Sequence, residues 1–309
     1  MRGLELSEKY YGEYADELFS GLENLRPLCA CGMCGSGSEC YGYDDAVSKD
    51  HDFEPGFCVF IPDDESVMSR RDAFLLERAY AKLPDEFMGF RRQKLSPVGG
   101  DRHGVFRIGE FFTSKIGVSD CVLTTEQWFS IPDYALSEAT NGRIFEDNLG
   151  KMTGCRAALL NMPEDVRLKK IAGALIVCAQ SGQYNYGRCI LHGEKGAAQL
   201  ALFEFADSCS KAVFLLNRTH RPFYKWRFRA MKGLERLGLL GGLLESLLLC
   251  RSENDAEDLL DVICGQLTDE VFSQGLSDRR CSSLEELAYE VNSRVSDGNL
   301  RNSGIFYGA

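Results

Sequence analysis

Two aspartates, Asp50 and Asp52, follow closely after the pair Gly37 and Ser38 in the amino-acid sequence. In an extended segment, side chains two residues apart point to the same face, so both carboxylates can converge on one point. Converging carboxylates suit Mg²⁺, which usually binds through one or two of them together with substrate phosphates. A Gly-Ser turn offers backbone N–H groups and a hydroxyl to phosphate oxygens. The pattern therefore indicates metal-assisted phosphoryl or nucleotidyl transfer.

The surrounding spacing resembles the signature of the nucleotidyltransferase superfamily, which has the DNA polymerase beta-like fold. That signature places a glycine and a serine before the aspartates, and Gly42 and Ser48 occupy those places, with Lys49 inserted. The longer string GSExxGxDDxxSxDHDF resembles an uncharacterised bacterial branch that has a kanamycin-nucleotidyltransferase-like helical C-terminal domain. Three later segments also resemble that branch, namely TNGRIFED (Thr140–Asp147), GQYNYGR (Gly182–Arg188) and LLNRTHRPFYKW (Leu215–Trp226).

The resemblance implies a reaction and its cofactors. Asp50 and Asp52 would bind one or two Mg²⁺ ions that bridge the phosphates of a nucleoside triphosphate, with ATP as the expected donor. Gly37 and Ser38 would hold the β- and γ-phosphates. A hydroxyl on a small molecule or a protein would then attack the α-phosphate, taking up AMP and releasing pyrophosphate. The alternative is a catalytically impaired regulatory module that binds nucleotide on the same fold.

A third carboxylate on a neighbouring strand is usual in active members of the superfamily, and the sequence does not identify it. The expected segment, His103–Phe112, has no acid in its strand part. Glu110 is the nearest candidate catalytic residue, although its position also suits the helix that follows. Asp147, after another short strand, is the second candidate. Each could instead be a solvated acid, and the absence of a third acid would favour the regulatory module.

Lys225 is the candidate triphosphate ligand in the second half of the chain. It lies in a stretch where Pro222 must interrupt a helix. Its ammonium could reach a triphosphate, or it could be a lysine that extends to solvent beside packed aromatic rings. Tyr224 and Trp226 could stack on a base or a sugar, but core packing is the expected role of Trp226.

The sequence contains 13 cysteines, an odd number that does not fit a regular disulfide scaffold. Four of them cluster at Cys29, Cys31, Cys34 and Cys40 and could hold zinc or an iron–sulfur cluster, which would make the chain a metal–thiol redox protein. Their spacing matches no common ligand pattern. We therefore expect reduced thiols, most of which act as small core residues.

Charge and hydropathy restrict the partners. With 46 acidic and 35 basic residues the formal net charge is −11, which disfavours a nucleic-acid acceptor and suits a cationic one such as an aminoglycoside. No signal peptide is recognisable, and the apolar run Leu237–Leu244 is far shorter than the ~18 residues of a membrane span. We therefore expect a cytoplasmic protein with no membrane partner. The leucine stripe Leu234–Leu249 suits a core or a dimer surface, so a homo-oligomer is compatible with the sequence.

The spacing of apolar residues predicts an α+β fold with two domains. Residues 1–150 would form a nucleotidyltransferase-type mixed sheet with flanking helices, and residues 151–309 an all-α helical bundle of the substrate-binding type. The predicted strands are Leu28–Cys34, Phe57–Ile61, Val105–Ile108 and Gly142–Phe145. The predicted helices of the second domain are Glu164–Leu191, Lys195–Leu216, Arg227–Cys250, Ala256–Gln274 and Leu284–Val295.

Overall fold

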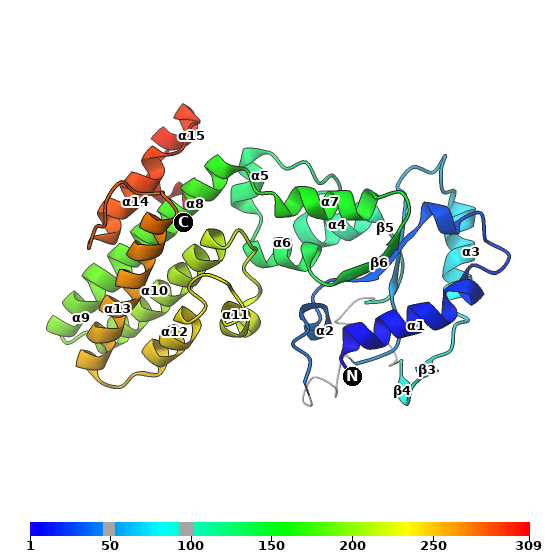
Figure 1. Ribbon diagram of the computed structural model, residues 1–309, viewed down its shortest axis with the longest axis horizontal. Helices are drawn as coiled ribbons and strands as arrows, with labels where there is room; N and C mark the ends of the chain where they lie inside the picture. The colour runs from blue at the N-terminus through cyan, green and yellow to red at the C-terminus, as the bar shows by residue number, and fades with distance from the viewer. Residues whose placement is uncertain (46–52, 93–101) are drawn as a thin grey trace. The chain divides into compact units, whose positions relative to one another are not determined.

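The structure, a computed structural model, describes residues 1–45, 53–92 and 102–309 (Figure 1). The chain forms two compact units. The first contains residues 1–123 and 135–161, and the second contains residues 124–134 and 162–309. A single boundary at residue 150 does not describe this division, because residues 124–134 join the second unit before the chain returns to the first.

The first unit is built on a mixed sheet of four strands in the order β5–β2–β1–β6. β1 (Ala30–Met33) pairs antiparallel with both β2 (Cys58–Ile61) and β6 (Arg143–Asp147). β2 pairs parallel with β5 (Gly104–Arg107). All residues of β1 and β2 are buried, which explains why these strands are continuous apolar runs in the sequence. The predicted mixed sheet is confirmed.

Helices cover both faces of this sheet. α1 (Gly3–Leu18) and α3 (Arg70–Tyr80) pack on one face. α4 (Ile108–Ile116) packs on the other, where the rings of Phe60 and Phe111 lie 5.1 Å apart. The core of the first face includes Tyr10, Leu18, Phe57, Val59, Ile61, Leu76 and Tyr80. The shorter elements are a 3₁₀ turn (Arg26–Leu28), α2 (Ser38–Tyr41), β3 (Glu86–Phe87), β4 (Phe90–Arg91), α6 (Asp133–Thr140) and α7 (Lys151–Leu160).

The described residues of the second unit contain helices and no strand, which confirms the predicted helical region. The predicted helix Glu164–Leu191 is helical throughout, but its middle, Ala179–Tyr186, is π-helical. Gly182 lies in this π segment against Phe205, where a Cβ atom would come within 2.4 Å of the ring. The helices are α5 (Thr125–Ser130), α8 (Glu164–Cys178), α9 (Gly187–Leu191), α10 (Lys195–Leu216), α11 (Tyr224–Met231), α12 (Leu240–Leu249), α13 (Glu253–Ser273), α14 (Leu284–Ser293) and α15 (Gly298–Asn302), with a final 3₁₀ turn (Ile305–Gly308).

The predicted single helix Arg227–Cys250 is wrong, because the chain turns between α11 and α12. Leu237 has a φ of 57°, which a continuous right-handed helix does not allow. The side chain of Asn217 holds this turn. Its Nδ2 donates to the carbonyl of Arg236 at 2.9 Å, and the N–H of Arg236 donates to its Oδ1 at 3.0 Å. A distant side chain therefore fixes a break that the apolar spacing conceals.

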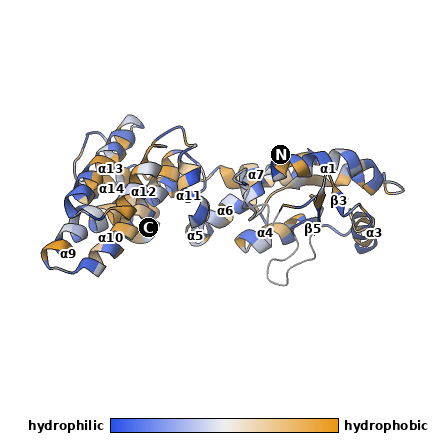
Figure 2. Cartoon of the chain, turned by 90° about the horizontal axis from the view of Figure 1, so that it is seen from below, coloured by the Kyte–Doolittle hydropathy of each residue, from blue (hydrophilic) through white to orange (hydrophobic). Residues whose placement is uncertain are grey.

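The core of the second unit lies between its long helices. Figure 2 shows hydrophobic residues gathered along α10, α12, α13 and α14, while hydrophilic residues occupy much of the outer surface of these helices. Phe205, Leu244, Leu267 and Leu287 are fully buried in this cluster. Among the described helices, none is both long enough and apolar enough to span a membrane.

Candidate functional site

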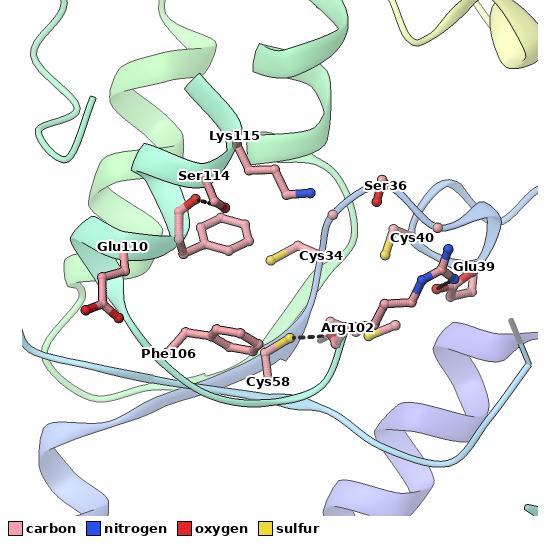
Figure 3. A pocket seen from close by; sticks show the side chains of 14 residues that line it. Cys34, Ser36, Glu39, Cys40, Cys58, Arg102, Phe106, Glu110, Ser114 and Lys115 are labelled. Carbon is pink, nitrogen blue, oxygen red and sulfur yellow. Dashed lines mark hydrogen bonds and ion pairs between the residues drawn. The ribbon is translucent and has the colours of Figure 1, made fainter. Parts of the chain in front are cut away.

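The first unit contains a pocket of ≈ 450 Å³ where the chain leaves β1 (Figure 3). The loop Gly35–Gly37 forms one wall, and α4 contributes Glu110, Ser114 and Lys115 to the opposite wall. Arg102 and the strand residue Phe106 also line it. Of the Gly-Ser pair predicted from the sequence, Gly37 therefore lines a concave site, whereas Ser38 is not among the described residues that line it.

The Gly-Ser loop needs glycine at two places for different reasons. Gly35 has a φ of +131°, a backbone conformation that side chains with a Cβ rarely adopt. At Gly37, a Cβ would come within 1.9 Å of the Glu39 carboxylate and displace it. Gly37 is the N-cap residue of α2. Ser38 is the first residue of that helix and is buried. The loop can therefore present main-chain groups to a ligand at close range.

Asn141 clamps the backbone of this loop from a distant part of the chain. The N–H of Gly35 donates to its Oδ1 at 2.9 Å, and its Nδ2 donates to the carbonyl of Gly35 at 2.6 Å. Arg156 in turn donates to the carbonyls of Thr140 and Asn141, each at 2.7 Å. Gly142 completes the turn at φ +69°, and a Cβ there would lie 2.0 Å from the carbonyl oxygen of Met33. The segment that sequence resemblance singled out thus shapes the loop.

Lys115 supplies positive charge beside the loop. A Cβ built on Gly35 would lie 3.7 Å from the Lys115 Nζ, so the ammonium is next to the Gly35 backbone. Figure 3 shows the lysine extending from α4 toward the stretch between Cys34 and Ser36. Its other neighbour is the Glu138 carboxylate at 3.3 Å, and the two side chains are 20% and 17% exposed. Lys115 was not predicted from the sequence. The one feature that could have indicated it is its position in the helix that directly follows the third predicted strand.

Glu39 is a buried carboxylate in the pocket wall that sequence reasoning also missed. Its side chain is 5% exposed and lies 3.7 Å from the Nη1 of Arg102. Because a buried charge is tolerated only when it is paired, the two side chains neutralise one another at this end of the pocket. The site thus contains two ion pairs, Lys115 with Glu138 beside the loop and Arg102 with Glu39 at the other end.

The described residues place the two candidates for the third carboxylate differently. Glu110 lies in the first turn of α4, is exposed, and lines the pocket. Figure 3 shows it at the far side of the pocket from Ser36 and Glu39. Asp147 ends β6 and accepts a hydrogen bond from the N–H of Thr153 at 2.7 Å, so it stabilises the start of α7. Among the described residues, neither acid belongs to a group of three or more His, Cys, Asp or Glu side chains that could hold a metal ion.

Asp50 and Asp52, the predicted metal ligands, lie outside the described residues. The described residues on either side of them meet at the start of α1. Asp44 accepts a hydrogen bond from the N–H of Gly3 at 2.8 Å, where a helix N-terminus favours negative charge. On the other side, the Phe53 ring lies 3.5 Å from the position of a Cβ on Gly3 and packs on Phe90 at 4.6 Å.

Lys225 belongs to the second unit and is exposed in the first turn of α11. Its Nζ lies 4.8 Å from the centre of the Trp226 ring, a cation–π contact. Trp226 is half-buried, and Tyr224 is 66% exposed. The aromatic neighbour predicted for Lys225 is therefore present, whereas a contact between Lys225 and a triphosphate stays a prediction.

The four clustered cysteines do not converge on one point. Cys29 and Cys31 belong to the core cluster under α1 and α3, whereas Cys34 and Cys40 line the pocket. Burial raises the pKa of the Cys34 thiol to about 12, and burial likewise raises the pKa of Cys40 well above its ordinary value. These thiols are therefore protonated near neutral pH and form part of the pocket's apolar lining. The described residues contain no group of three metal-ligating side chains.

Comparison with known proteins gives one match. The family described as a domain of unknown function, DUF4037, matches residues 128–227, which is less than half of the chain. The matched stretch begins in α5 and ends in α11, and it includes Asn141 of the clamp and Lys225. No curated protein and no solved structure matches the chain significantly. Over residues 128–227 the chain is thus similar to a family whose description states no activity.

Proposed function

We propose that the chain is a Mg²⁺-dependent nucleotidyltransferase that transfers AMP from ATP to a hydroxyl acceptor and releases pyrophosphate. The observation that carries the proposal is the position of the Lys115 ammonium beside the Gly35 backbone, within a pocket at the end of β1. A lysine next to a glycine-rich turn is a suitable environment for phosphate oxygens, because a point charge and main-chain dipoles act on the same group. Asn141 would keep that turn in its binding shape before the ligand arrives.

The described residues fit the phosphate part of the donor. Gly37 and Ser38 would approach the β- and γ-phosphates, and Lys115 would offset their charge. Protonated Cys34 and Cys58 together with Phe106 would exclude water from the apolar side of the pocket. Exclusion of water lowers the local dielectric constant, which strengthens the attraction between the lysine and the phosphates. The ≈ 450 Å³ of the pocket lies within the range of ordinary small-molecule sites.

The metal would be held by Asp50 and Asp52, on the evidence of their spacing. When bound, Mg²⁺ supplies charge stabilisation to the attacking and leaving oxygens. Glu39 and Glu110 are the carboxylates in the described wall of the pocket, and either would be a candidate third ligand. Glu39 is paired with Arg102. Its partner Arg102 would then be available to the triphosphate, since a guanidinium can exchange a carboxylate for a phosphate.

Net charge and one exposed lysine concern the acceptor and a further contact with the donor. A net charge of −11 favours a cationic small molecule or a protein hydroxyl over nucleic acid. Lys225 is proposed as a further triphosphate ligand, because it is exposed in α11. Its ammonium contacts the Trp226 ring, and among the described residues no ion pair with an acid is seen for it. A cytoplasmic location and the possibility of a homo-oligomer are part of the same proposal.

A regulatory module that binds nucleotide without transferring it is the second candidate. The placement of Asp147 favours it, because this acid is engaged at the start of α7. The exposed position of Glu110, away from Glu39 in the pocket, favours it as well. Under this candidate, the pocket would bind ATP and no pyrophosphate would form.

One experiment separates the two candidates. The purified chain is incubated with ATP labelled on the α-phosphate and Mg²⁺, over a panel of aminoglycosides, other hydroxyl compounds and proteins, while pyrophosphate is measured. We expect release that depends on an acceptor and is lost in Asp50→Asn and Asp52→Asn. Asp16→Asn is the matched control, because Asp16 lies in α1, is 93% exposed and forms an ion pair with Arg26.

The outcomes are distinct. Release that survives in both Asp50→Asn and Asp52→Asn would contradict the proposed metal ligands. Saturable ATP binding without pyrophosphate for any acceptor would establish the regulatory module instead. Failure of the chain to bind ATP at all would overturn both candidates.

A further inference from the structure

A second pocket, of ≈ 400 Å³, lies entirely within the helical unit. Its wall carries one side-chain carboxylate, Asp133, and four basic side chains, Lys170, Lys211, Arg221 and Arg227, and Ala309 also lines it. These five residues come from the start of α6, from α8, from α10, from the loop after α10 and from α11. All five lie in the stretch 128–227 that matches DUF4037. Four basic side chains thus line one cavity, although the chain as a whole has a net charge of −11.

The acids nearby do not balance this charge. Lys170 donates to Asp133 at 3.1 Å, and the two side chains are only 3% and 10% exposed, so each largely satisfies the other. Arg221 and Arg227 both contact the carboxylate of Asp207, at 3.0 Å and 2.5 Å. The Nε of Arg221 also lies 3.8 Å from the Asp133 carboxylate, which Lys170 already shares. Asp207 is 49% exposed, so water screens much of its charge, whereas the two arginines are 16% and 14% exposed.

Two groups in the pocket have unused capacity for an anion. The Nε of Arg227 is buried and has no hydrogen-bond partner among the described residues. The Nζ of Lys211 has one such partner, the carbonyl of Gly308 at 3.0 Å, although an ammonium has three donors. Burial lowers the pKa of Lys211 to about 8, with repulsion from Lys170 and Arg221 opposing the attraction of Asp133. A bound anion would offset the repulsion among these basic groups and stabilise the charged form of Lys211.

Aromatic rings stand beside the basic groups. Tyr134 and Phe223 line the same pocket and meet edge to face, with their ring centres 5.5 Å apart. The ring of Tyr224, also in the wall, lies 4.4 Å from that of Phe223 and is 66% exposed. An anion with an attached ring could therefore place its charge among the basic side chains and its apolar part against these rings.

We propose that this pocket binds a phosphate group, either as free phosphate or as the phosphate of a small aromatic molecule, through Lys211, Arg221 and Arg227. Phosphate suits the site because arginine guanidinium groups recognise its oxygens in pairs and lysine adds a point charge. The site is in the helical unit and uses none of the residues proposed for nucleotidyl transfer. It therefore does not rest on the proposed function.

Calorimetric titration of the full chain with inorganic phosphate at pH 7, without Mg²⁺, tests the proposal. We expect saturable binding to one site, weakened about tenfold or more in Lys211→Gln and in Arg221→Gln, since each loses a charge-assisted hydrogen bond. The matched controls are Lys195→Gln, 82% exposed in the same helix as Lys211, and Arg188→Gln, exposed in α9. Both controls should keep the affinity of the unmodified chain. Thermal unfolding verifies that each variant folds.

Further ligands identify the source of the phosphate. If phenyl phosphate binds more tightly than inorganic phosphate, and Tyr224→Ala removes only that difference, the natural ligand carries an aromatic group. Equal affinity for the two would assign the site to free phosphate. Asp50→Asn should bind phosphate unchanged, so a failure of nucleotidyl transfer and a failure of this site are distinguishable.

Three results would overturn the proposal. The first is no heat of binding at millimolar phosphate for a correctly folded chain. The second is an equal loss of affinity in Lys195→Gln and Lys211→Gln, which would indicate diffuse charge attraction. The third is competition by chloride at concentrations similar to those of phosphate, because a site built for a doubly charged oxyanion should strongly prefer the latter.

Discussion

The side-chain amide of Asn141 bonds both main-chain polar groups of Gly35, although 106 residues separate them in the sequence. Its Oδ1 accepts from the N–H at 2.9 Å, and its Nδ2 donates to the carbonyl at 2.6 Å. A single side chain thereby replaces the pairing that a strand would otherwise provide at the end of β1. The glycine-rich turn of the proposed phosphate site is consequently held by the tertiary structure.

Removal of this clamp should damage ATP binding more than folding. In Asn141→Ala we expect a loss of about 1–3 kcal/mol in the free energy of unfolding, from two hydrogen bonds, and at least a tenfold weaker affinity for ATP. Urea denaturation and ATP titration measure the two effects. Asn148→Ala is the control, because Asn148 is exposed and its side chain donates to the neighbouring Glu146 at 2.7 Å. A lower stability with unchanged ATP affinity would show that the clamp is structural only.

Lys115→Gln should weaken ATP binding about tenfold, because the pocket loses the charge next to Gly35 while the side chain keeps a similar length. The dependence of the affinity on salt concentration should also become weaker, since one of the ionic contacts disappears. Titration with ATP at two salt concentrations measures both. Lys82→Gln, an exposed lysine of the same unit, serves as the control. An equal effect in both variants would refute a specific role for Lys115.

Gly142→Ala should destabilise the first unit by roughly 3 kcal/mol, because it forces a left-handed residue and a clash with the Met33 carbonyl. Gly154→Ala provides the opposite case. Gly154 is exposed in α7 with open space around its Cβ position, so alanine should stabilise that helix by about 1 kcal/mol. Urea denaturation of both variants checks the contrast, and similar values for the two would disprove the proposed close approach.

The pKa of Lys211 is about 8 in the folded state and 10.5 in the unfolded state. Lys211 should therefore make the protein more stable as the pH rises from about 8 toward 10.5. Between these values the unfolded chain holds a proton that the folded chain has lost, so stability increases with pH. The facing groups are Lys170, Arg221, Asp133 and Asp207. The expected gain is about 2 kcal/mol. The buried thiols lower the stability of both chains over the same range, because their pKa values are raised in the folded state. The gain is therefore measured as a difference: between pH 7 and pH 10 in urea unfolding, the unmodified chain should change by about 2 kcal/mol more favourably than Lys211→Met, and equal changes in both would contradict it.

Local sequence patterns were sufficient for most elements. The spacing of apolar residues placed all four strands of the mixed sheet, and it gave both ends of α10 as the structure has them. Such patterns succeed because burial acts on neighbouring residues with the period of a helix or a strand. They failed at the turn after α11, where the amide of Asn217 acts on Arg236 from another helix end.

For the candidate site, the sequence by itself identified the Gly-Ser turn as a candidate phosphate-binding segment, because that chemistry restricts residue type and spacing within a short segment. The metal site of Asp50 and Asp52 stays a prediction, since both lie outside the described residues. Only the tertiary structure identified Lys115 and Asn141 as neighbours of that turn, paired Glu39 with Arg102, and gave Asp147 a place at the start of α7. It alone assembled Lys211, Arg221 and Arg227 into one cavity. These groupings depend on contacts between residues far apart in the chain, and such contacts follow from packing rather than from any local period.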